Sequence, residues 1–402
     1  MEESSTRKAL EKQLTESTGK ERIGFLCKLS PMIRSIDPSE TIKYCREALD
    51  LLKSFPDKDL ESGLLGDICW AYQNIGKYQE ALEYGFKHLE LSREIKNKKE
   101  EANSLNEIGV TYWRLACYDD ALEYSFKALR LLEELNDPSG VADINNNICI
   151  LFTDMKKNEK ALEYCRKALE YYSNSSSGEK GINESINHSN TLNNMGAIHQ
   201  ELENYTEALK FHRASLEMRN TLDDKKGISH SNVNIGLALR GISKHQEALE
   251  CFFKALKTTR EIDDKNTEAD ILLNIGITYA SMNDFDKALE YIRQCEVSAR
   301  KINAKCILSN CYKELSSLHK NMSDFEKALF FLEKHKLLEN EIFNKDTRKR
   351  MLELEVRYNV KSRIKEAEIT RRKNRELAET NLELSNALKE VKTLCFLQKD
   401  QR

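Results

Sequence analysis

Tandem asparagines are the residues of this chain whose type and spacing most favour the binding of a ligand. Residues 144–149 read INNNIC and residues 192–196 read LNNMG. Asparagine is a mediocre helix former that prefers caps and turns, yet the apolar residues around both stretches have helical spacing. An asparagine amide offers donors and an acceptor without a charge to desolvate. A row of such amides along a groove would bind the N–H and C=O groups of an extended peptide.

Residue patterns typical of catalysis are missing from the sequence. It contains no HExxH zinc motif, no phosphate-binding loop ending in GKS or GKT, no GxGxxG motif and no GxSxG motif. The 11 cysteines include no CxxC pair and no pair with metal-binding spacing. We therefore expect a protein that is not an enzyme and that binds neither a metal nor a cofactor.

Composition favours a cytoplasmic all-α protein. The 402 residues include only 4 prolines and 15 glycines, too few for the many turns of a sandwich or barrel. A net charge of −3 argues against general nucleic-acid binding, which needs a basic excess. No run of about 18 apolar residues is present to span a membrane, and the first residues lack the apolar core of a secretory signal. Cysteines without a disulfide framework fit a reducing compartment, so we expect a cytoplasmic location.

A 40-residue repeat organises most of the chain. Strings such as KYQEALEY, CYDDALEY and DFDKALEY align through one alanine each. The aligned alanines are Ala81, Ala121, Ala161, Ala208, Ala248, Ala288 and Ala328. Neighbouring alanines are 40 residues apart (121 − 81 = 40), except for a gap of 47 between Ala161 and Ala208. Stepping back 40 residues from Ala81 reaches Thr41 in a more degenerate copy, so the array contains about eight repeats.

Each repeat carries a second recurring string before its alanine, for example LNEIGVTY at 105–112. Its apolar, small and aromatic residues are three or four apart, so each repeat reads as two antiparallel helices. These strings resemble the tetratricopeptide repeat family, whose usual repeat has about 34 residues. In one repeat the matching residues are Leu105, Ile108, Gly109, Tyr112, Tyr118, Ala121 and Ala128. The resemblance implies an all-α fold: a right-handed superhelical solenoid of about eight helix pairs, followed by a long C-terminal helix or coiled coil.

The resemblance also divides the chain into segments. We expect an N-terminal helical cap at 1–20, the repeat array at 21–345, and a capping helix with a coiled-coil tail at 346–402. The gap of 47 residues falls where Ser, Gly and Asn cluster, so we expect an inserted loop near 173–185. The alternative is that this insertion is a hinge between two halves of the array.

In the family, the first helix of each pair lines the concave groove, and the aligned alanine is position 20 of the repeat. Groove-facing positions 5 and 6 hold Asn106, Asn146, Asn147, Asn193, Asn194, Asn234 and Asn274. Position 2 adds Asn103, Asn190 and Asn310. Trp70 at position 9 and Trp113 at position 12 add aromatic anchors, which are frequent hot spots. We expect these residues to bind a partner peptide in the groove.

A structural role for the asparagines is the alternative. Their amides can bond each other or neighbouring backbone and so tie adjacent repeats together. Asn145 and Asn232 occupy position 4, normally an apolar core position, and are expected to be satisfied buried amides or to mark an error of register. Cysteines in small-residue positions, such as Cys69, Cys149 and Cys295, are expected to pack as small apolar side chains.

The tail contains no glycine or proline across 348–394 and is expected to form a long helix. Its candidate coiled-coil seam, with a seven-residue spacing, is Leu377, Asn381, Leu384, Leu388 and Val391. An asparagine in such a seam favours a parallel dimer, so we expect a homodimer. A basic run at 361–375 is expected to be a solvated helix face, with a patch for an anionic membrane or nucleic acid as the alternative.

The expected function is that of a non-catalytic scaffold or adaptor in signal transduction, which binds a partner peptide and dimerises through its tail. The tail also resembles the signalling helices that connect repeat arrays to output domains in bacterial sensor proteins. The alternative is therefore a sensory or regulatory fragment that relays to a separate or lost output domain, such as a diguanylate cyclase or a histidine kinase. No nucleic-acid partner and no membrane span are expected.

Overall fold

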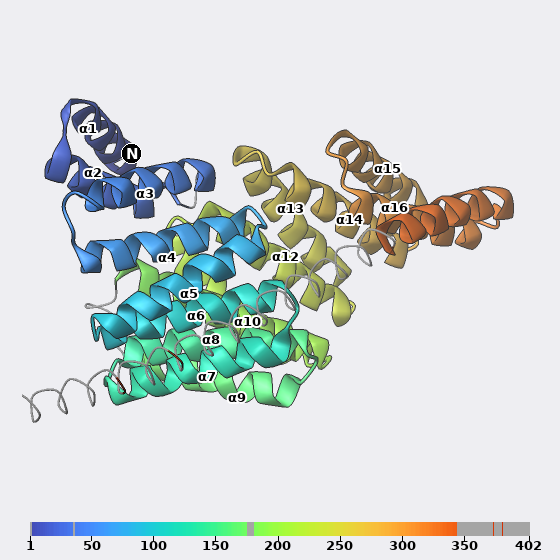
Figure 1. Ribbon diagram of the computed structural model, residues 1–402. Helices are drawn as coiled ribbons and strands as arrows, with labels where there is room; N and C mark the ends of the chain where they lie inside the picture. The colour runs from blue at the N-terminus through green and yellow to red at the C-terminus, as the bar shows by residue number, and fades with distance from the viewer. Residues whose placement is uncertain (1, 35–36, 175–180, 344–372, 374–379, 381–402) are drawn as a thin grey trace, which may run out of the picture. The chain divides into compact units, whose positions relative to one another are not determined.

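A computed structural model describes residues 2–34, 37–174 and 181–343 of the chain, together with residues 373 and 380 (Figure 1). The chain divides into two units, residues 1–348 and 349–402, and nearly all described residues belong to the first. These residues form helices and their connecting turns, and no strand occurs within the described ranges. The predicted tail at 346–402, with its dimer seam and its basic run, lies outside the described residues apart from positions 373 and 380.

Helices of 17 residues separated by turns of three residues account for the 40-residue period. In one repeat, α6 spans Lys98–Arg114 and α7 spans Tyr118–Glu134, and α8 begins at Pro138. Two such helices and two such turns fill one period, and the pattern recurs along the chain.

The other helices are α1 (Glu2–Glu16), α2 (Gly19–Ile33), α3 (Pro38–Leu52), α4 (Lys58–Asn74), α5 (Tyr78–Glu94), α8 (Pro138–Asp154), α9 (Asn158–Asn174), α10 (Ile182–Glu201), α11 (Tyr205–Thr221), α12 (Lys225–Gly241), α13 (His245–Glu261), α14 (Lys265–Ser281), α15 (Phe285–Lys301) and α16 (Lys305–Asn321). Residues 325–343 are helical as well. They pack on α16, where Ser316 Oγ donates to Ala328 O at 2.7 Å and the His319 ring stacks on Phe331. None of the described helices is long and apolar enough to cross a membrane.

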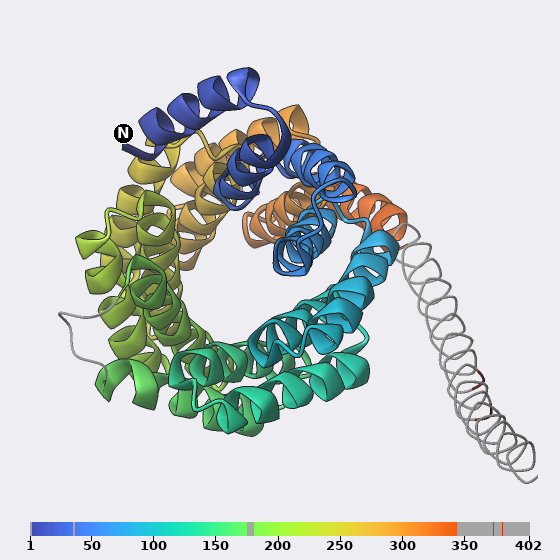
Figure 2. The same ribbon diagram turned by 60° about the vertical axis from the view of Figure 1, so that its left-hand side comes forward.

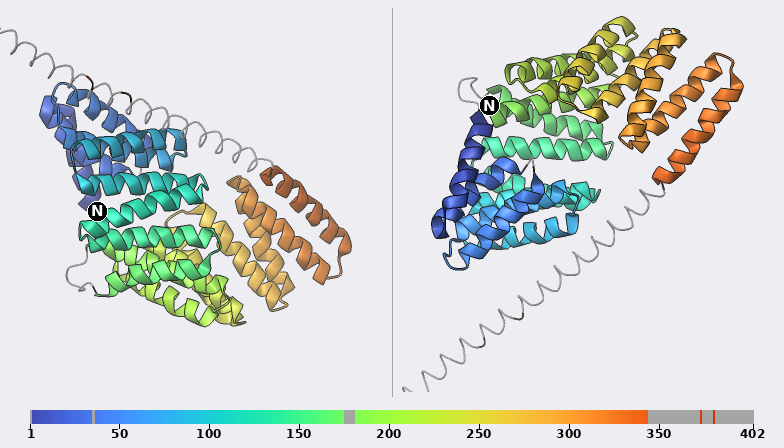
Figure 3. Two further views of the ribbon diagram at one scale, coloured as in Figure 1. Left: turned by 60° about the horizontal axis from the view of Figure 1, so that its bottom comes forward. Right: turned by 90° about the horizontal axis from the view of Figure 1, so that it is seen from above.

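Local capping sets the boundaries of these helices. Asp137, which precedes α8, accepts a hydrogen bond at Oδ1 from the backbone N–H of Gly140 at 3.0 Å, as an N-cap does. The turns between helices place one residue in the left-handed region, for example Asn136 at φ 52° and Asn303 at φ 55°. Because this turn recurs, successive helices run antiparallel and side by side (Figure 3).

The aligned alanines lie where the two helices of a pair pack most closely. The six from Ala81 to Ala288 are completely buried, so a larger side chain would force the helices apart. Aromatic rings fill the space beside them, as where Tyr112 stacks on Tyr124 with ring centroids 5.5 Å apart. Successive pairs share their buried faces and follow one another along a curved array (Figure 2). The predicted all-α solenoid of helix pairs is therefore confirmed.

The N-terminal helix α1 packs on the first helix pair. Leu10 and Leu14 of α1 belong to the same apolar cluster as Ile23 and Leu26 of α2. Thr41 of α3 occupies the aligned-alanine position and is fully buried. The degenerate first copy thus packs as the later repeats do.

Two features differ from the expectations drawn from sequence. Residues 173–174 and 182–185, predicted as loop, are helical, because α9 continues to Asn174 and α10 has 20 residues where α8 has 17. The rest of the predicted insertion, 175–180, lies outside the described residues. Cys149, expected to be a packing thiol, is joined to Cys165 by a disulfide within one helix pair.

Candidate functional site

The tandem asparagines bond one another between neighbouring first helices. An asparagine at position 6 of one repeat donates from Nδ2 to Oδ1 of the asparagine at position 5 of the repeat before it. This bond recurs at 3.0, 3.1 and 2.8 Å in the pairs Asn147–Asn106, Asn194–Asn146 and Asn234–Asn193. We call these six residues the asparagine row. The row links α6, α8, α10 and α12.

The amides of the row keep polar atoms that these bonds do not use. The Nδ2 atoms at position 5 and the Oδ1 atoms at position 6 have no hydrogen-bond partner among the described residues. None of these atoms is buried away from solvent. Free donors and free acceptors therefore alternate along the row, and an extended peptide backbone presents the complementary pattern of C=O and N–H groups.

An apolar line runs beside the row, at position 9, about one helical turn further along each first helix. Its half-buried members are Trp70, Val110, Ile150, Ala197, Leu237 and Ile277. A small cavity between α6 and α8 adjoins both features, since its lining includes Val110, Trp113, Asn147 and Ile150. A peptide on this surface can bond its backbone to the amides and pack alternate side chains against the apolar line.

The two tryptophans, the only ones in the chain, each contact a residue outside their own helix. Trp113 Nε1 donates to Asp154 Oδ2 of α8 at 2.6 Å. The Trp70 ring lies 5.2 Å from the guanidinium of Arg34. Both side chains are half-buried, so each presents a pre-oriented part of its ring to solvent.

The row ends at α12 because the next residue at position 5 has no amide. That residue is Val233, and Asn274 at position 6 of α14 therefore lacks an asparagine partner. Asn274 Nδ2 donates instead to Asp270 O at 2.9 Å, and Asn274 Oδ1 accepts from Arg240 Nη1 at 3.1 Å. Asn274 thus faces the same side as the row but is held by a cation.

The predicted asparagines at position 2 have separate environments. Asn190 Oδ1 accepts from Nη2 of the buried Arg219 at 2.8 Å. Asn103 is exposed and donates to Glu100 Oε1 at 3.4 Å. Asn310 is exposed and has no hydrogen bond among the described residues. Hydrogen bonds therefore do not join these three asparagines into a second row.

Asn145 and Asn232 are buried, as position 4 of the repeat requires, so the alignment of the repeats is in the correct register. Asn232 Nδ2 donates to Ile228 O at 2.8 Å, one turn earlier in α12. Asn145 is 4 % exposed, and its Oδ1 has no partner among the described residues. Both side chains lie on the core side of their helices.

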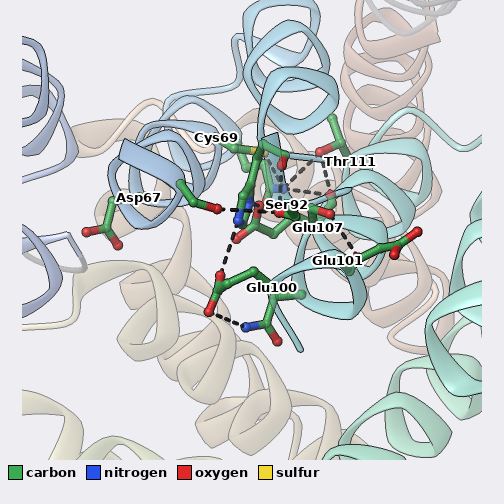
Figure 4. Close-up of polar contacts among 12 residues, drawn as sticks. Asp67, Cys69, Ser92, Glu100, Glu101, Glu107 and Thr111 are labelled. Carbon is green, nitrogen blue, oxygen red and sulfur yellow. Dashed lines mark hydrogen bonds and ion pairs between the residues drawn. The ribbon is translucent and has the colours of Figure 1, made fainter. Parts of the chain in front are cut away.

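A charged cluster replaces the amides at the N-terminal end of the row (Figure 4). Position 6 of α6 is Glu107, and position 5 of α4 is Gly66. A Cβ at Gly66 would lie 3.1 Å from the His88 ring and 3.0 Å from Glu107 Oε1, so glycine leaves room for both side chains. His88 Nδ1 lies 3.0 Å from Glu107 Oε2, and His88 Nε2 lies 3.2 Å from Glu100 Oε2. We call His88, Glu100 and Glu107 the histidine–carboxylate cluster.

The electrostatics of this cluster favour a charged histidine. Burial alone would lower the pKa of His88, but the hydrogen bonds to Glu100 and Glu107, together with their charges, outweigh burial and raise the pKa of His88 to about 9. The hydrogen bond from His88 lowers the pKa of Glu100. One imidazolium and two carboxylates leave a net charge of −1 at this end of the row.

The sequence contains a weak signal for the cluster that pattern matching does not detect. His88 occupies position 27, where other repeats have Ala128, Ala168 and Ala255. The histidine at position 27 is followed in the next repeat by Glu107 in an asparagine position, and this combination marks the junction of the two repeats, although the last repeat also has a histidine, His335, at position 27. No group of three or more histidine, cysteine or acidic side chains in the described part of the chain is arranged to hold a metal ion.

Part of the chain matches a known repeat family, and solved structures have a similar fold. A family model of the tetratricopeptide repeat matches residues 140–221, 187–261 and 227–301. None of the curated protein sequences compared with the chain matches it.

Several solved structures have a similar fold. The apo form of the quorum sensor NprR from B. thuringiensis is 17 % identical with a TM-score of 0.62, over 82 % of this chain and 91 % of that chain. A signal transduction ATPase with numerous domains and a tetratricopeptide repeat sensor, from Pyrococcus horikoshii, is 16 % identical with a TM-score of 0.57, over 86 % of this chain and 54 % of that chain. A Rap conjugation gene regulator of a plasmid, in complex with a Phr peptide, is 14 % identical with a TM-score of 0.53, over 85 % of this chain and 96 % of that chain.

Proposed function

We propose, from the tetratricopeptide repeats that residues 140–301 contain, that this chain is a non-catalytic interaction protein whose asparagine row binds an extended peptide segment of a partner. The observation that carries the proposal is the alternation of unused amide donors and acceptors beside the apolar line at position 9. Each hydrogen bond to a peptide contributes only about 1 kcal/mol net. Apolar side chains packed along position 9 therefore supply much of the affinity and the choice of partner.

A regulatory role in signal transduction, in the cytoplasm, is part of the proposal. It is supported by solved structures with the same fold, of which one is a regulator in complex with a Phr peptide and another is a quorum sensor. In such a role, peptide occupancy would change how the array contacts a second protein. The bound segment would be the signal or the partner itself.

A second candidate is a sensory unit that relays to an output domain. It is supported by the Pyrococcus horikoshii protein, in which a tetratricopeptide sensor region is part of a longer chain with numerous domains. The homodimer predicted from Leu377, Asn381, Leu384, Leu388 and Val391 belongs to this proposal as well. Light scattering of the full chain and of a version ending at residue 346 tests it. A dimer that becomes a monomer on truncation is expected, and a truncated chain that remains dimeric would rule out the tail seam.

The peptide-binding proposal is tested by affinity selection. The full chain is immobilised, exposed to a random nonapeptide pool, washed, and the retained peptides are identified by mass spectrometry. The test variant is the double substitution Asn147→Ala and Asn194→Ala, and the control is Asn220→Ala, an exposed asparagine on the second helix α11. We expect wild type and the control to retain the same peptides and the double variant to retain few. Equal recovery by a double variant with unchanged circular dichroism would remove the row from the binding site.

A further inference from the structure

The two ends of the asparagine row carry opposite charge. At α6 lies the histidine–carboxylate cluster, with its net charge of −1. Asp154 of α8 adds another carboxylate on this side, where it accepts from Trp113 Nε1 at 2.6 Å. Two cations lie on the same side: Arg34 pairs with Asp67 at 3.3 Å, and the Arg114 guanidinium lies 4.9 Å from the Trp113 ring. The negative charge that a peptide meets at this end is therefore that of the histidine–carboxylate cluster itself.

A cation, the guanidinium of Arg240, lies at the other end of the row. Arg240 occupies position 12 of α12, the position that Trp113 has in α6. Its Nη1 donates to the backbone O of Asn274 at 3.3 Å and to Asn274 Oδ1 at 3.1 Å. No ion pair to Arg240 occurs among the described residues, and Glu314 acts on it only from beyond ion-pair distance.

A half-buried guanidinium without an ion pair has a specific chemical preference. Removing a cation from water is costly unless an anion compensates it. Arg240 also keeps Nε and Nη2 hydrogens that are not bonded within the described part of the chain. A carboxylate can accept two of these hydrogens together, which a neutral ligand group does less well.

Between the two ends, the residues at positions 5 and 6 of the first helices carry no charge. Position 6 is asparagine in α8, α10, α12 and α14. Packed helices lie about 10 Å apart, so the three steps from α6 to α12 span roughly 30 Å. An extended peptide advances about 3.3 Å per residue, so about nine residues connect the two ends.

We propose that the groove selects an extended peptide of about nine residues with a cationic amino end and an anionic carboxyl end. The cationic end lies against the histidine–carboxylate cluster, and the carboxylate lies against Arg240. This inference rests on the proposed function, because it assigns chemistry and direction to the same bound peptide. The free termini of a short peptide add charge of the matching sign in this direction only, so they reinforce the orientation.

Three nonapeptide pools test the inference by fluorescence anisotropy with the full chain. All have free termini, the same randomised mixture of Val, Ile, Leu and Ser in the middle, and fluorescein on a central cysteine. The matched pool begins with Lys and ends with Glu, the reversed pool begins with Glu and ends with Lys, and the third has Lys at both ends. We expect wild type to bind the matched pool about tenfold more tightly than the reversed pool, with a ratio that falls as salt is added.

Variants that change one charge of the protein test which residue binds each end of the peptide. Glu107→Gln keeps an acceptor for His88 and removes one carboxylate, so the preference for a cationic amino end should fall several-fold. Arg240→Glu should make the third pool bind more tightly than the matched pool. The control is Lys127→Glu on α7, an exposed lysine that pairs with Glu123, and it should leave every ratio unchanged.

The outcomes separate this inference from the proposed function. Equal binding of matched and reversed pools by wild type, with both lost in the Asn147→Ala and Asn194→Ala variant, overturns the charge assignment and leaves peptide binding standing. Failure of wild type to bind any pool overturns both. Retention of the wild-type preference by a folded Arg240→Glu chain overturns the role of Arg240 alone.

Discussion

Nδ2 of Asn147 donates to Oδ1 of Asn106 at 3.0 Å, between the neighbouring first helices α8 and α6. The bond uses one of two hydrogens on the donor amide and one of two lone pairs on the acceptor. Each side chain therefore keeps groups for a ligand while it contributes to the contact between repeats. The structural and ligand-binding roles that sequence presents as alternatives are compatible in this geometry.

Replacing both partners of this bond separates the two roles. In a chain with Asn106→Leu and Asn147→Leu, donor and acceptor disappear together and no polar group loses its partner. We expect the free energy of unfolding to change by less than about 1 kcal/mol, while the affinity for row-binding peptides falls at least tenfold. Urea unfolding and fluorescence anisotropy measure the two effects. Unchanged peptide affinity in this variant would mean that these amides have a structural role only.

The histidine–carboxylate cluster makes stability depend on pH in one direction. The pKa of His88 is raised from 6.5 to about 9 in the folded chain, so its stabilising contribution is complete below pH 6.5 and is lost as pH rises through 9. At about 1.4 kcal/mol per pKa unit the contribution is on the order of 3 kcal/mol. The difference in urea midpoint between wild type and His88→Gln should therefore be largest near pH 6 and smaller at pH 10. A difference that grows with pH would show that His88 is neutral in the folded state.

Replacing either of two helical glycines by alanine should change the stability of the chain, in opposite directions at the two sites. A Cβ at Gly236 would lie 2.6 Å from Phe252 Cε1, inside the fully buried core, so Gly236→Ala should destabilise the chain by about 1–3 kcal/mol. A Cβ at Gly63 would meet nothing within 4 Å, so Gly63→Ala in α4 should stabilise by about 0.5–1 kcal/mol through helix propensity. Thermal unfolding measures both. Two shifts of the same sign would be inconsistent with this packing.

Thiol labelling reports the burial of the cysteines. Cys306 is exposed, whereas burial raises the pKa of the half-buried Cys27 to about 11 and that of the buried Cys69 well above its usual value. Since the thiolate is the reactive form, iodoacetamide should modify Cys306 first, then Cys27, and Cys69 only on unfolding. Mass spectrometry of peptides from timed reactions gives the order. Early modification of Cys69 would contradict its place in the core.

The helix pairs could be predicted from sequence because their determinants are local and repeated. Ala121 and its equivalents recur at a fixed period, and 17-residue helices with three-residue turns impose the same period on the backbone. The structure of residues 173–185, where the 40-residue period is interrupted, could be predicted only in part. Ser, Gly and Asn there indicate a loop, whereas α9 continues to Asn174 and α10 begins at Ile182, so helix extends into the segment against its local propensity.

The partners of individual polar atoms could not be predicted. That Asn147 bonds Asn106 depends on the distance between α6 and α8, which is a property of packing and not of either helix. The position of His88 between Glu100 and Glu107 likewise needs α5 and α6 together, and the space left by Gly66 on α4. Repeat register identifies which residues share a face, but not which of their hydrogen-bonding groups remain available.

Backbone binding by the asparagine row can be tested by blocking the hydrogen bonds of the peptide itself. A peptide retained in the affinity selection is synthesised with and without N-methyl groups on alternate backbone amides, and both forms are titrated against wild type and against the variant with Asn147→Ala and Asn194→Ala. If the row bonds the peptide backbone, methylation should weaken binding to wild type at least tenfold and change binding to the variant far less, since the lost bonds are the same. Equal affinity of the two peptides for wild type would show that the row does not bind the peptide backbone.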